Sequence, residues 1–235
     1  MRPGKKLEID ILTLFPAMFE GPLRESLIGR AQAKGLIRIG IHDLRDFTLD
    51  KHRKVDDKLF GGGAGMLLKA EPIYRAFKSL GAIKKGKHKP TVVYLSPQGR
   101  PFSQSLALKL AQKKHLILLC GHYEGIDERT DRWIDMEISI GDYVLTGGEI
   151  PALVLADAVS RVVPGVVKEW GSVQNDSFFN GVLDCAQYTR PADFLGMKVP
   201  EVLLSGNHKA IEAWRKKNSQ ERTLKKRSDL LNHKR

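Results

Sequence analysis

The residues of this chain best suited to hold a ligand lie in four segments rich in glycine or turn-forming residues. They are GGGAGM (Gly61–Met66), YLSPQGRPFSQ (Tyr94–Gln104), CGHYEGIDER (Cys120–Arg129) and SIGDYVLTGGEIPA (Ser139–Ala152). Glycine has no Cβ, so these segments can offer backbone N–H and C=O groups at close range. None contains a GxxxxGK[ST] phosphate loop or a strand-to-helix GxGxxG, so neither a P-loop nucleotidase nor a Rossmann site is supported. Taken singly, each segment is more simply an ordinary turn.

Three of the four segments follow short apolar stretches that predict buried strands. These stretches are Thr91–Leu95, Leu116–Cys120 and Met136–Ile140, and they alternate with helical patterns at Ser103–Lys113 and Glu149–Val163. This alternation predicts an α/β domain whose parallel sheet is covered on both faces. Ligands of such sheets bind beyond the carboxyl ends of the strands. We therefore expect the three segments to meet at one edge, in a site that suits a flat, hydrogen-bonding ligand such as an adenine ring.

Apolar side chains in these segments supply the walls of the expected site. Leu95, Ile140 and Leu145 are the candidates. The preceding part of the chain adds two predicted strands, Leu7–Leu14 and Ile37–Asp43, which carry the apolar content and alternation typical of strands.

Two helices and one long loop complete the first part of the chain. The helices are predicted at Ser26–Lys34 and Ala70–Leu80. Between the second strand and the second helix, Lys51–Met66 is charged and glycine-rich with no regular period, and a loop of this length is usually functional or disordered. The acidic pair Asp56–Asp57 and Lys58 lie in this loop, where a solvated turn is the simpler interpretation than a substrate contact.

Positive charge is concentrated at the C-terminal end. Residues 208–235 hold ten Lys or Arg and three Asp or Glu, so they carry +7 of the formal net charge of +12. A basic appendage on a nearly balanced body is typical of a module that binds a polyanion, although a solvated, Lys-rich helical tail is the alternative. Helices are predicted at Lys209–Lys217 and Ser219–Leu230, and a linker at 168–175 separates them from the α/β domain.

Several classes of protein and site are disfavoured. The two cysteines, Cys120 and Cys185, are far apart and form no CxxC, so neither a disulfide scaffold nor a Cys-rich zinc site is expected. No apolar run approaches the ~20 residues of a membrane-spanning helix, and the N-terminus lacks the apolar region of a signal peptide. The composition therefore predicts a cytoplasmic protein without a membrane partner.

Seven motifs in order resemble those of one enzyme family. YLSPQG, CGHYEGIDER, SIGDYVLTGGE, SRVVPGV, NDSF, YTRP and VPEVLLSGNH are similar to the motifs of bacterial tRNA (guanine-N1)-methyltransferases, a family of the SPOUT class of knotted methyltransferases. The resemblance runs from about Leu7 to about Leu231. It implies transfer of a methyl group from S-adenosylmethionine to N1 of the guanine directly 3′ of a tRNA anticodon.

The resemblance also implies a fold and a cofactor site. The fold is a parallel α/β sheet with a trefoil knot on its C-terminal side, in a domain of residues 1–167, followed by a small, mainly helical tRNA-binding domain of residues 176–235. The residues at the positions of the family's cofactor contacts are Tyr94, Leu95, Ser96, Pro97, Gly121, Tyr123, Glu124, Ile140, Gly141, Asp142, Tyr143, Val144, Leu145, Gly147, Gly148 and Pro151.

Two residues match the family's catalytic positions. Asp176, in NDSF, corresponds to the general base that removes the N1 proton, and Arg161, in SRVVPGV, corresponds to the cation that faces O6. From the residues alone, Asp176 is as readily an N-cap before SFF, and Arg161 closes a helix whose C-terminal turn favours a cation. His122 stands where many relatives have Arg, which indicates a positive contact rather than proton transfer.

The family's partners complete the expectation. They are a second copy of the chain, in a homodimer with active sites at the subunit interface, and the anticodon arm of tRNA, held in part by Lys225, Lys226 and Arg227. The resemblance allows for Mg²⁺, but no carboxylate cluster in the sequence specifies a metal site. Ala64 replaces a proline common in the family. Two alternative functions are another SPOUT RNA methyltransferase, acting on ribose or a different base, and a non-catalytic RNA-binding protein.

Overall fold

The computed structural model describes residues 6–83, 86 and 89–232 in two compact units. Unit 1 extends to Lys168 and unit 2 begins at Glu169. The first five and the last three residues, which the predicted domains include, lie outside the described residues.

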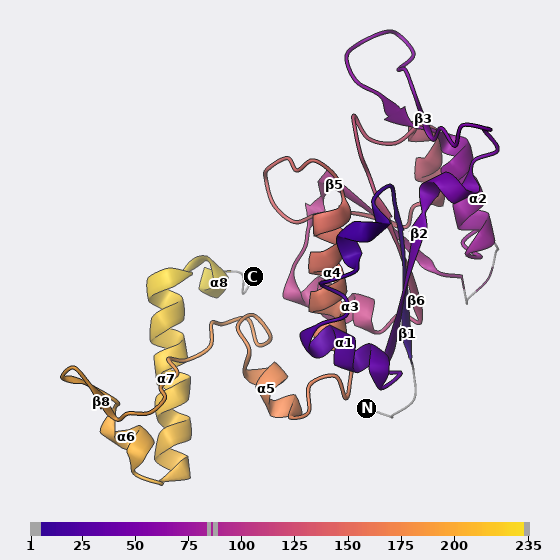
Figure 1. The fold of residues 1–235 in the computed structure, drawn as a ribbon. Coiled ribbons are helices and arrows are strands. Elements are labelled where there is room, and N and C mark those ends of the chain that lie inside the picture. The colour runs from indigo at the N-terminus through magenta and orange to yellow at the C-terminus, as the bar shows by residue number, and fades with distance from the viewer. Residues whose placement is uncertain (1–5, 84–85, 87–88, 233–235) are drawn as a thin grey trace. The chain divides into compact units, whose positions relative to one another are not determined.

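A five-stranded parallel sheet forms the centre of unit 1 (Figure 1). Its strands are β1 (Leu7–Thr13), β2 (Ile37–Asp43), β5 (Thr91–Pro101), β6 (His115–Cys120) and β7 (Met136–Ser139). Their order across the sheet is β2-β1-β6-β5-β7, and every neighbouring pair is parallel. The carboxyl ends of β5, β6 and β7 therefore lie at one edge, as the sequence predicts.

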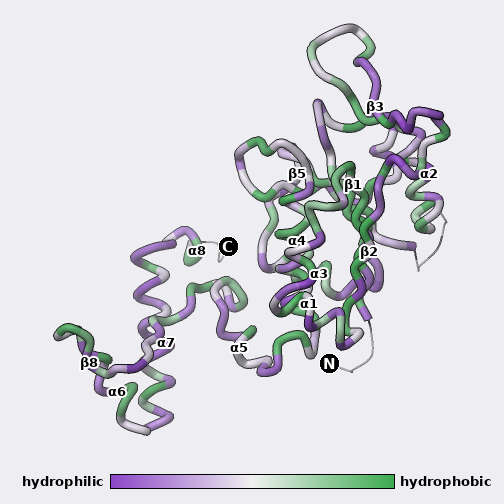
Figure 2. Tube along the Cα trace, viewed as in Figure 1, coloured by the Kyte–Doolittle hydropathy of each residue, from purple (hydrophilic) through white to green (hydrophobic). Residues whose placement is uncertain are grey.

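Helices cover both faces of this sheet, which confirms the predicted layers. On one face lie α1 (Ser26–Ala33), α3 (Gln104–Ala111) and α4 (Glu149–Arg161), and on the other lies α2 (Ala70–Ser79) (Figure 1). Side chains of β1 point to the two faces of the sheet in alternation. Ile9 and Ile11 pack in the core with α4, whereas Leu12 packs in the core with α2. Figure 2 shows hydrophobic residues along the strands and α4, in contrast to the mainly hydrophilic α7.

The segment after Leu95 is a bulge within β5 rather than a loop that follows a strand. Leu95 pairs with Ile138 of β7, and pairing resumes with Arg100 opposite the same residue. Gly99 allows β5 to pair with β7 again after the bulge, because a Cβ on Gly99 would lie 2.3 Å from the backbone nitrogen of Ile138. Ser96–Gly99 consequently stand out from the sheet at its ligand-binding edge.

The long loop before α2 is closed by a short antiparallel hairpin. Its strands are β3 (Asp56–Asp57) and β4 (Leu67–Leu68), and the glycine-rich segment Gly61–Met66 lies between them. β4 is also held from its other side, because the amide of Leu68 donates to the carbonyl of Gly125 and the amide of Asp127 donates to the carbonyl of Leu68. The hairpin therefore packs beside the segment that follows β6.

Unit 2 is mainly helical. Its elements are α5 (Trp170–Asn175), the hairpin β8 (Asp193–Phe194) and β9 (Met197–Lys198), α6 (Glu201–Leu204), α7 (His208–Lys226) and α8 (Asp229–Asn232). None of the described helices combines the length and apolar character needed to cross a membrane.

Two details of unit 2 differ from the prediction. α5 occupies most of the range 168–175 that was expected to be a linker. Only one residue of this helix, Val173, is buried, so its sequence shows no helical repeat of apolar residues. The two helices predicted on either side of Asn218 are continuous in α7, which ends at Lys226, whereas the end of the second predicted helix, Ser219–Leu230, falls in the separate helix α8. Asn218 does not end it, because its side-chain oxygen accepts a hydrogen bond from the backbone nitrogen of Ala186, 2.8 Å away. Asn218 therefore makes a tertiary contact with Ala186, which the sequence around Asn218 does not indicate.

Candidate active site

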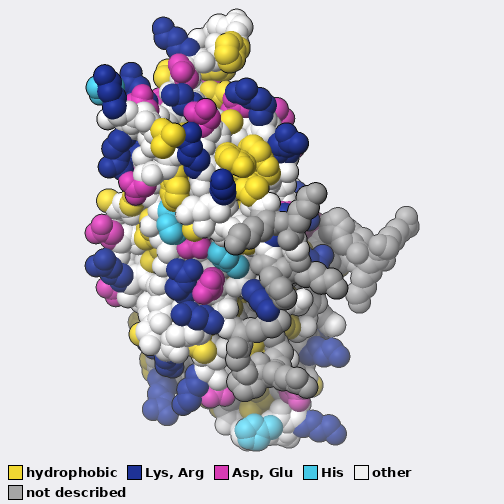
Figure 3. All heavy atoms as spheres, turned by 90° about the vertical axis from the view of Figure 1, so that its right-hand side faces the viewer, with side chains coloured by type: hydrophobic (Ala, Val, Ile, Leu, Met, Phe, Trp, Pro, Cys, Tyr) yellow, Lys and Arg dark blue, Asp and Glu magenta, His cyan; other side chains and the backbone are white. Residues whose placement is uncertain are grey.

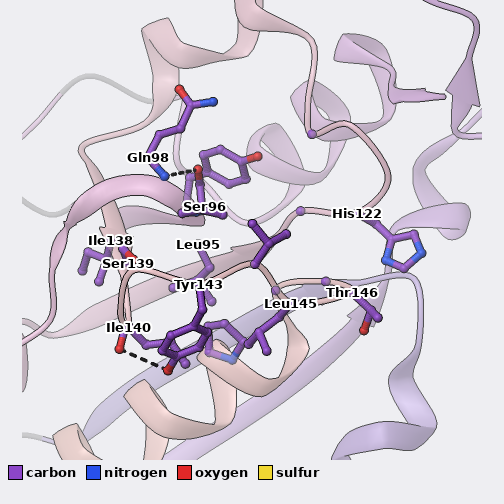
Figure 4. Close-up of a pocket in the computed structure, with 18 of the residues that line it drawn as sticks. Leu95, Ser96, Gln98, His122, Ile138, Ser139, Ile140, Tyr143, Leu145 and Thr146 are labelled. Carbon is purple, nitrogen blue, oxygen red and sulfur yellow. Dashed lines mark hydrogen bonds between the residues drawn. The ribbon is translucent and has the colours of Figure 1, made fainter. Parts of the chain in front are cut away.

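A cavity of about 370 Å³ lies at the carboxyl edge of β5, β6 and β7 (Figure 4). It is lined by the three segments that the sequence predicts to meet there. All the predicted cofactor residues except Asp142 line it. Asp142 is instead exposed at the apex of a tight turn, in which the amide of Tyr143 donates to the carbonyl of Gly141. The structure also adds lining residues from the same segments: Gln98, His122, Gly125, Ile138, Ser139 and Thr146.

Backbone contacts join the segment after β6 to the start of α4. The amide of Gly148 donates to the carbonyl of Gly121 at 2.8 Å, and His122 and Gly147 form an antiparallel bridge. A Cβ on Gly148 would lie 2.6 Å from the Cα of Cys120. The cavity therefore depends on a close approach of two main chains that only glycine permits at this position.

Tyr94 forms a neutral wall of the cavity. Burial raises the pKa of its phenol to about 12, and the negative charges of Glu137 and Glu128 act in the same direction. The ring lies against Gly121, where a Cβ would be 2.9 Å from the phenol oxygen. At neutral pH, Tyr94 thus offers an O–H group and an apolar ring face, and it is not a base.

The segment after β7 is fixed by its own polar groups. The hydroxyl of Ser139 accepts from the amide of Gly141 at 3.2 Å and donates to the carbonyl of the same residue at 2.9 Å. The phenol of Tyr143 donates to the carbonyl of Ile140 at 3.3 Å (Figure 4). Val144 beyond it is 82% exposed. The segment is therefore anchored at the sheet and presents apolar side chains at the mouth of the cavity.

His122 carries a polar atom with no partner in the described part of the protein. Its Nδ1 is buried without a hydrogen bond, and its ring packs between Phe15 and Tyr123, with centroid distances of 5.0 and 4.6 Å. Leaving a buried polar group unsatisfied is costly, and in this conformation Nδ1 is closed off from solvent. The contact role of His122 remains a prediction from the family resemblance.

A buried carboxylate ties α4 to β1 below the cavity. Glu149, the first residue of α4, is 3% exposed, and its Oε1 accepts from the hydroxyl of Thr13 at 2.7 Å. Cys120 lies nearby at the end of β6, where burial and then the charge of Glu149 raise the pKa of its thiol. The thiol is therefore protonated and unsuited to act as a nucleophile. Glu149 was not predictable as a site residue, since one glutamate at a helix start carries no distinctive signal in the sequence.

The two predicted catalytic residues belong to different units. Arg161 is the last residue of α4 in unit 1, and Asp176 directly follows α5 in unit 2. Both side chains are half-buried. The N-cap interpretation of Asp176 is wrong, because Asp176 ends α5 and its amide donates to the carbonyl of Val173. The helix-closing position of Arg161 is confirmed. Their catalytic roles remain predictions from the family resemblance.

The predicted tRNA-binding cations lie at the exposed end of α7. Lys225 and Lys226 occupy its last turn. The guanidinium of Arg227 donates to both carboxylate oxygens of Asp229, at 2.6 to 3.2 Å, and lies 5.6 Å over the ring of Phe178. The two lysines are therefore more available to phosphate than Arg227.

The described residues do not fit a Mg²⁺ site. Within residues 6–83, 86 and 89–232, no group of three or more His, Cys, Asp or Glu side chains is placed to hold a metal ion. We derive no step through Mg²⁺.

Comparisons with known proteins agree on one family. The sequence model of tRNA (Guanine-1)-methyltransferase TrmD matches residues 7–233. The tRNA (guanine-N(1)-)-methyltransferase of Endomicrobium trichonymphae is 58% identical over 231 residues, which cover 96% of this chain and 99% of that protein. The enzymes of the same name from Ruminiclostridium cellulolyticum and Carboxydothermus hydrogenoformans are each 55% identical over 96% of this chain, and the matches cover 97% and 87% of those proteins.

Proposed function

The chain belongs to the tRNA (guanine-1)-methyltransferase family, and on this premise we propose that it transfers a methyl group from S-adenosylmethionine to N1 of the guanine directly 3′ of the anticodon in tRNA. Family membership makes it an enzyme that methylates N1 of a tRNA guanine. The observation that carries the proposal is the cavity of Figure 4, around which the three family motifs converge. We place the reaction in the cytoplasm.

The cavity fits S-adenosylmethionine in size and in chemistry. Its volume of about 370 Å³ falls in the range of small-molecule sites. Leu95, Ile140 and Leu145, the apolar walls expected from the sequence, line the cavity and offer apolar surface to an adenine ring. When bound, S-adenosylmethionine supplies a methyl group carried on a positively charged sulfur. The glycine-bearing segments hold and orient the donor, while Tyr94 contributes only neutral groups.

Asp176 and Arg161 prepare the guanine. N1 of guanine carries a proton and is a poor nucleophile until that proton leaves. A carboxylate within hydrogen-bond reach can accept this proton, which is the role we assign to Asp176. As the proton leaves, negative charge spreads to O6, and the fixed guanidinium of Arg161 stabilises it.

We further propose the family's knot and its homodimer. The order β6-β5-β7, with backbone contacts between the segments after β6 and β7, supports a trefoil knot. An exposed apolar surface on α4 supports the dimer. Ile150 and Val154 lie one turn apart on this helix and are 47% and 40% exposed. The 3-10 turn Pro16–Phe19, which contacts α4, adds Met18, which is 42% exposed. Val154→Glu should give a monomer in sedimentation velocity.

The decisive experiment is nucleoside mass spectrometry of a tRNA transcript after incubation with the protein and S-adenosylmethionine. We expect 1-methylguanosine. A matched transcript with adenine in place of the guanine 3′ of the anticodon should yield none. Ribose-methylated nucleosides would favour another SPOUT enzyme. If no methylated product forms and calorimetry shows no binding of S-adenosylmethionine, the result would favour the alternative of a non-catalytic RNA-binding protein.

A further inference from the structure

A second cavity opens between the β3–β4 hairpin, the start of α2 and the 3-10 segment Glu128–Trp133. Its volume is about 790 Å³, and it shares no lining residue with the cavity of Figure 4. Its cationic and aromatic lining residues are Lys58, Phe60, Lys69, Arg129, Arg132 and Trp133. None of them has a role in the reaction described above.

Two aromatic rings contribute to this cavity in different ways. Phe60 is 100% exposed at the start of a glycine run, so its whole ring faces solvent. Trp133 is half-buried, packs at 4.9 Å from the ring of Tyr74, and carries the guanidinium of Arg132 at 5.8 Å above its own ring. A fully exposed aromatic residue beside a ring-stacked arginine is typical of surfaces that bind unpaired bases.

The lining of this cavity carries a small excess of positive charge, because it has four Lys or Arg side chains and three Asp or Glu side chains. Among the described residues, its ion pairs join Arg129 to Asp127 at 2.6 Å and Lys69 to Asp57 at 4.0 Å. Lys58 and Arg132 take part in no such pair, and Glu71 is the remaining carboxylate of the lining. Figure 3 shows Lys and Arg side chains beside hydrophobic ones on the upper part of this face, over β3 and α2.

The segment Cys120–Arg129 connects the two cavities. Its first half lines the cavity of Figure 4, and its second half, with Asp127 and Arg129, lines the second cavity. The β3–β4 hairpin is fastened to the middle of this segment, where the amide of Glu124 donates to the carbonyl of Met66 at 3.1 Å. Gly65 allows the close contact, because a Cβ on it would lie 2.5 Å from a carboxylate oxygen of Glu124.

We propose that the second cavity is an RNA subsite, in which an unpaired base of the substrate tRNA stacks on Phe60 while Lys58 and Arg132 contact the adjoining phosphates. This inference rests on the proposed function, since it requires tRNA as substrate. The segment Cys120–Arg129 lines the cofactor cavity with its first half and the second cavity with its second half. An RNA strand bound in the second cavity would therefore lie beside the methyl-transfer site. The exposure of Phe60, together with two cations, Lys58 and Arg132, that form no ion pair among the described residues, carries it.

The test measures tRNA binding by Phe60→Ala, Phe60→Trp and Leu49→Ala variants of the full chain. Leu49 is a matched control, because it is 80% exposed and lines neither cavity. Removing one stacking ring should weaken tRNA binding roughly 5- to 100-fold. Phe60→Trp should bind like wild type, and S-adenosylmethionine affinity should be unchanged in all three. Separately, Lys58→Gln and Arg132→Gln should each reduce the slope of log Kd against log salt by about 1.

The wild-type protein in the same assays separates the two hypotheses. If it neither binds nor methylates tRNA, the proposed function fails. If it is active and Phe60→Ala binds tRNA as tightly as Leu49→Ala, the subsite is overturned. A Phe60→Ala variant that becomes monomeric in sedimentation while its tRNA affinity stays unchanged would assign this surface to a second copy of the chain, and would also overturn it.

Discussion

Asp10 of β1 and His115 of β6 meet across the sheet with 2.6 Å between Oδ2 and Nε2. The other oxygen of the carboxylate lies 2.8 Å from Nε2 of His42 on β2. Asp10 is 2% exposed. Gly40 makes room for it, since a Cβ there would lie 2.4 Å from Oδ1. One buried carboxylate thus links three strands, on a part of the sheet remote from the methyl-transfer cavity.

This arrangement predicts a pH-dependent stability. Burial acts to raise the pKa of Asp10, but the hydrogen bonds from His115 and His42 outweigh it and hold the pKa well below its ordinary value of 3.8. The contribution of Asp10 to stability is therefore present above about pH 4–5 and is lost as the pH falls below that range. Asp10→Asn should lower the free energy of unfolding at pH 7 by about 1.5–3 kcal/mol. Urea titrations at pH 7 and pH 3.5 should show the difference from wild type shrinking at the lower pH; a constant difference would contradict the expectation.

A second prediction concerns the close approach of main chains at Gly148. Gly148→Ala should reduce S-adenosylmethionine affinity and destabilise unit 1 by about 1–3 kcal/mol, because the added methyl meets the backbone of Cys120 and cannot be relieved by a side-chain rotation. Gly21→Ala is the matched control, since a Cβ there meets nothing within 4 Å. Calorimetry and thermal unfolding of both variants test this. Cofactor affinity equal to wild type in a folded Gly148→Ala protein would refute the role of this contact.

The sheet was predictable because its signals are local. β2 matches the predicted strand Ile37–Asp43 residue for residue, and the family assignment is confirmed by a match over residues 7–233. The bulge in β5 was not predictable, because it depends on the distance from Gly99 to a different strand. The continuity of α7 through Asn218 depends likewise on Ala186, 32 positions earlier in the chain.

The cofactor site was predicted from motif positions, which carry more information about segments than about single side chains. Motifs identify which segments meet, so nearly all the predicted cofactor residues line one cavity. They do not show which residues within a turn face the cavity, which is why Asp142 was predicted although it does not line the cavity, and why the lining residues Gln98 and Thr146 were not predicted. The second cavity was invisible for another reason. Trp133 and Phe60 lie 73 positions apart, and only the fold brings them to one surface.

A third prediction tests the proposed general base. Asp176→Asn removes the proton acceptor but keeps a side chain of the same shape, so methyl transfer should fall about 10²- to 10⁴-fold. S-adenosylmethionine affinity should be unchanged, because Asp176 belongs to none of the three segments that form the cofactor cavity. Single-turnover methylation and calorimetry measure the two quantities, with the exposed Asp131→Asn as control. Turnover equal to wild type would remove Asp176 from the mechanism.

A last prediction separates the three cations at the end of α7. Lys225 and Lys226 project from its final turn, while Arg227 is engaged by Asp229 and by the ring of Phe178. If this end of unit 2 binds tRNA phosphates, each lysine that makes a contact should reduce the salt slope of tRNA binding by about 1 when it is replaced by glutamine. Arg227→Gln should change that slope less and should instead lower the stability of unit 2, because it loses the contacts to Asp229 and Phe178. S-adenosylmethionine affinity should not change in any of the three. A wild-type slope in the Lys225→Gln/Lys226→Gln double variant would show that these lysines are a solvated surface, and that the tRNA is held elsewhere on the protein.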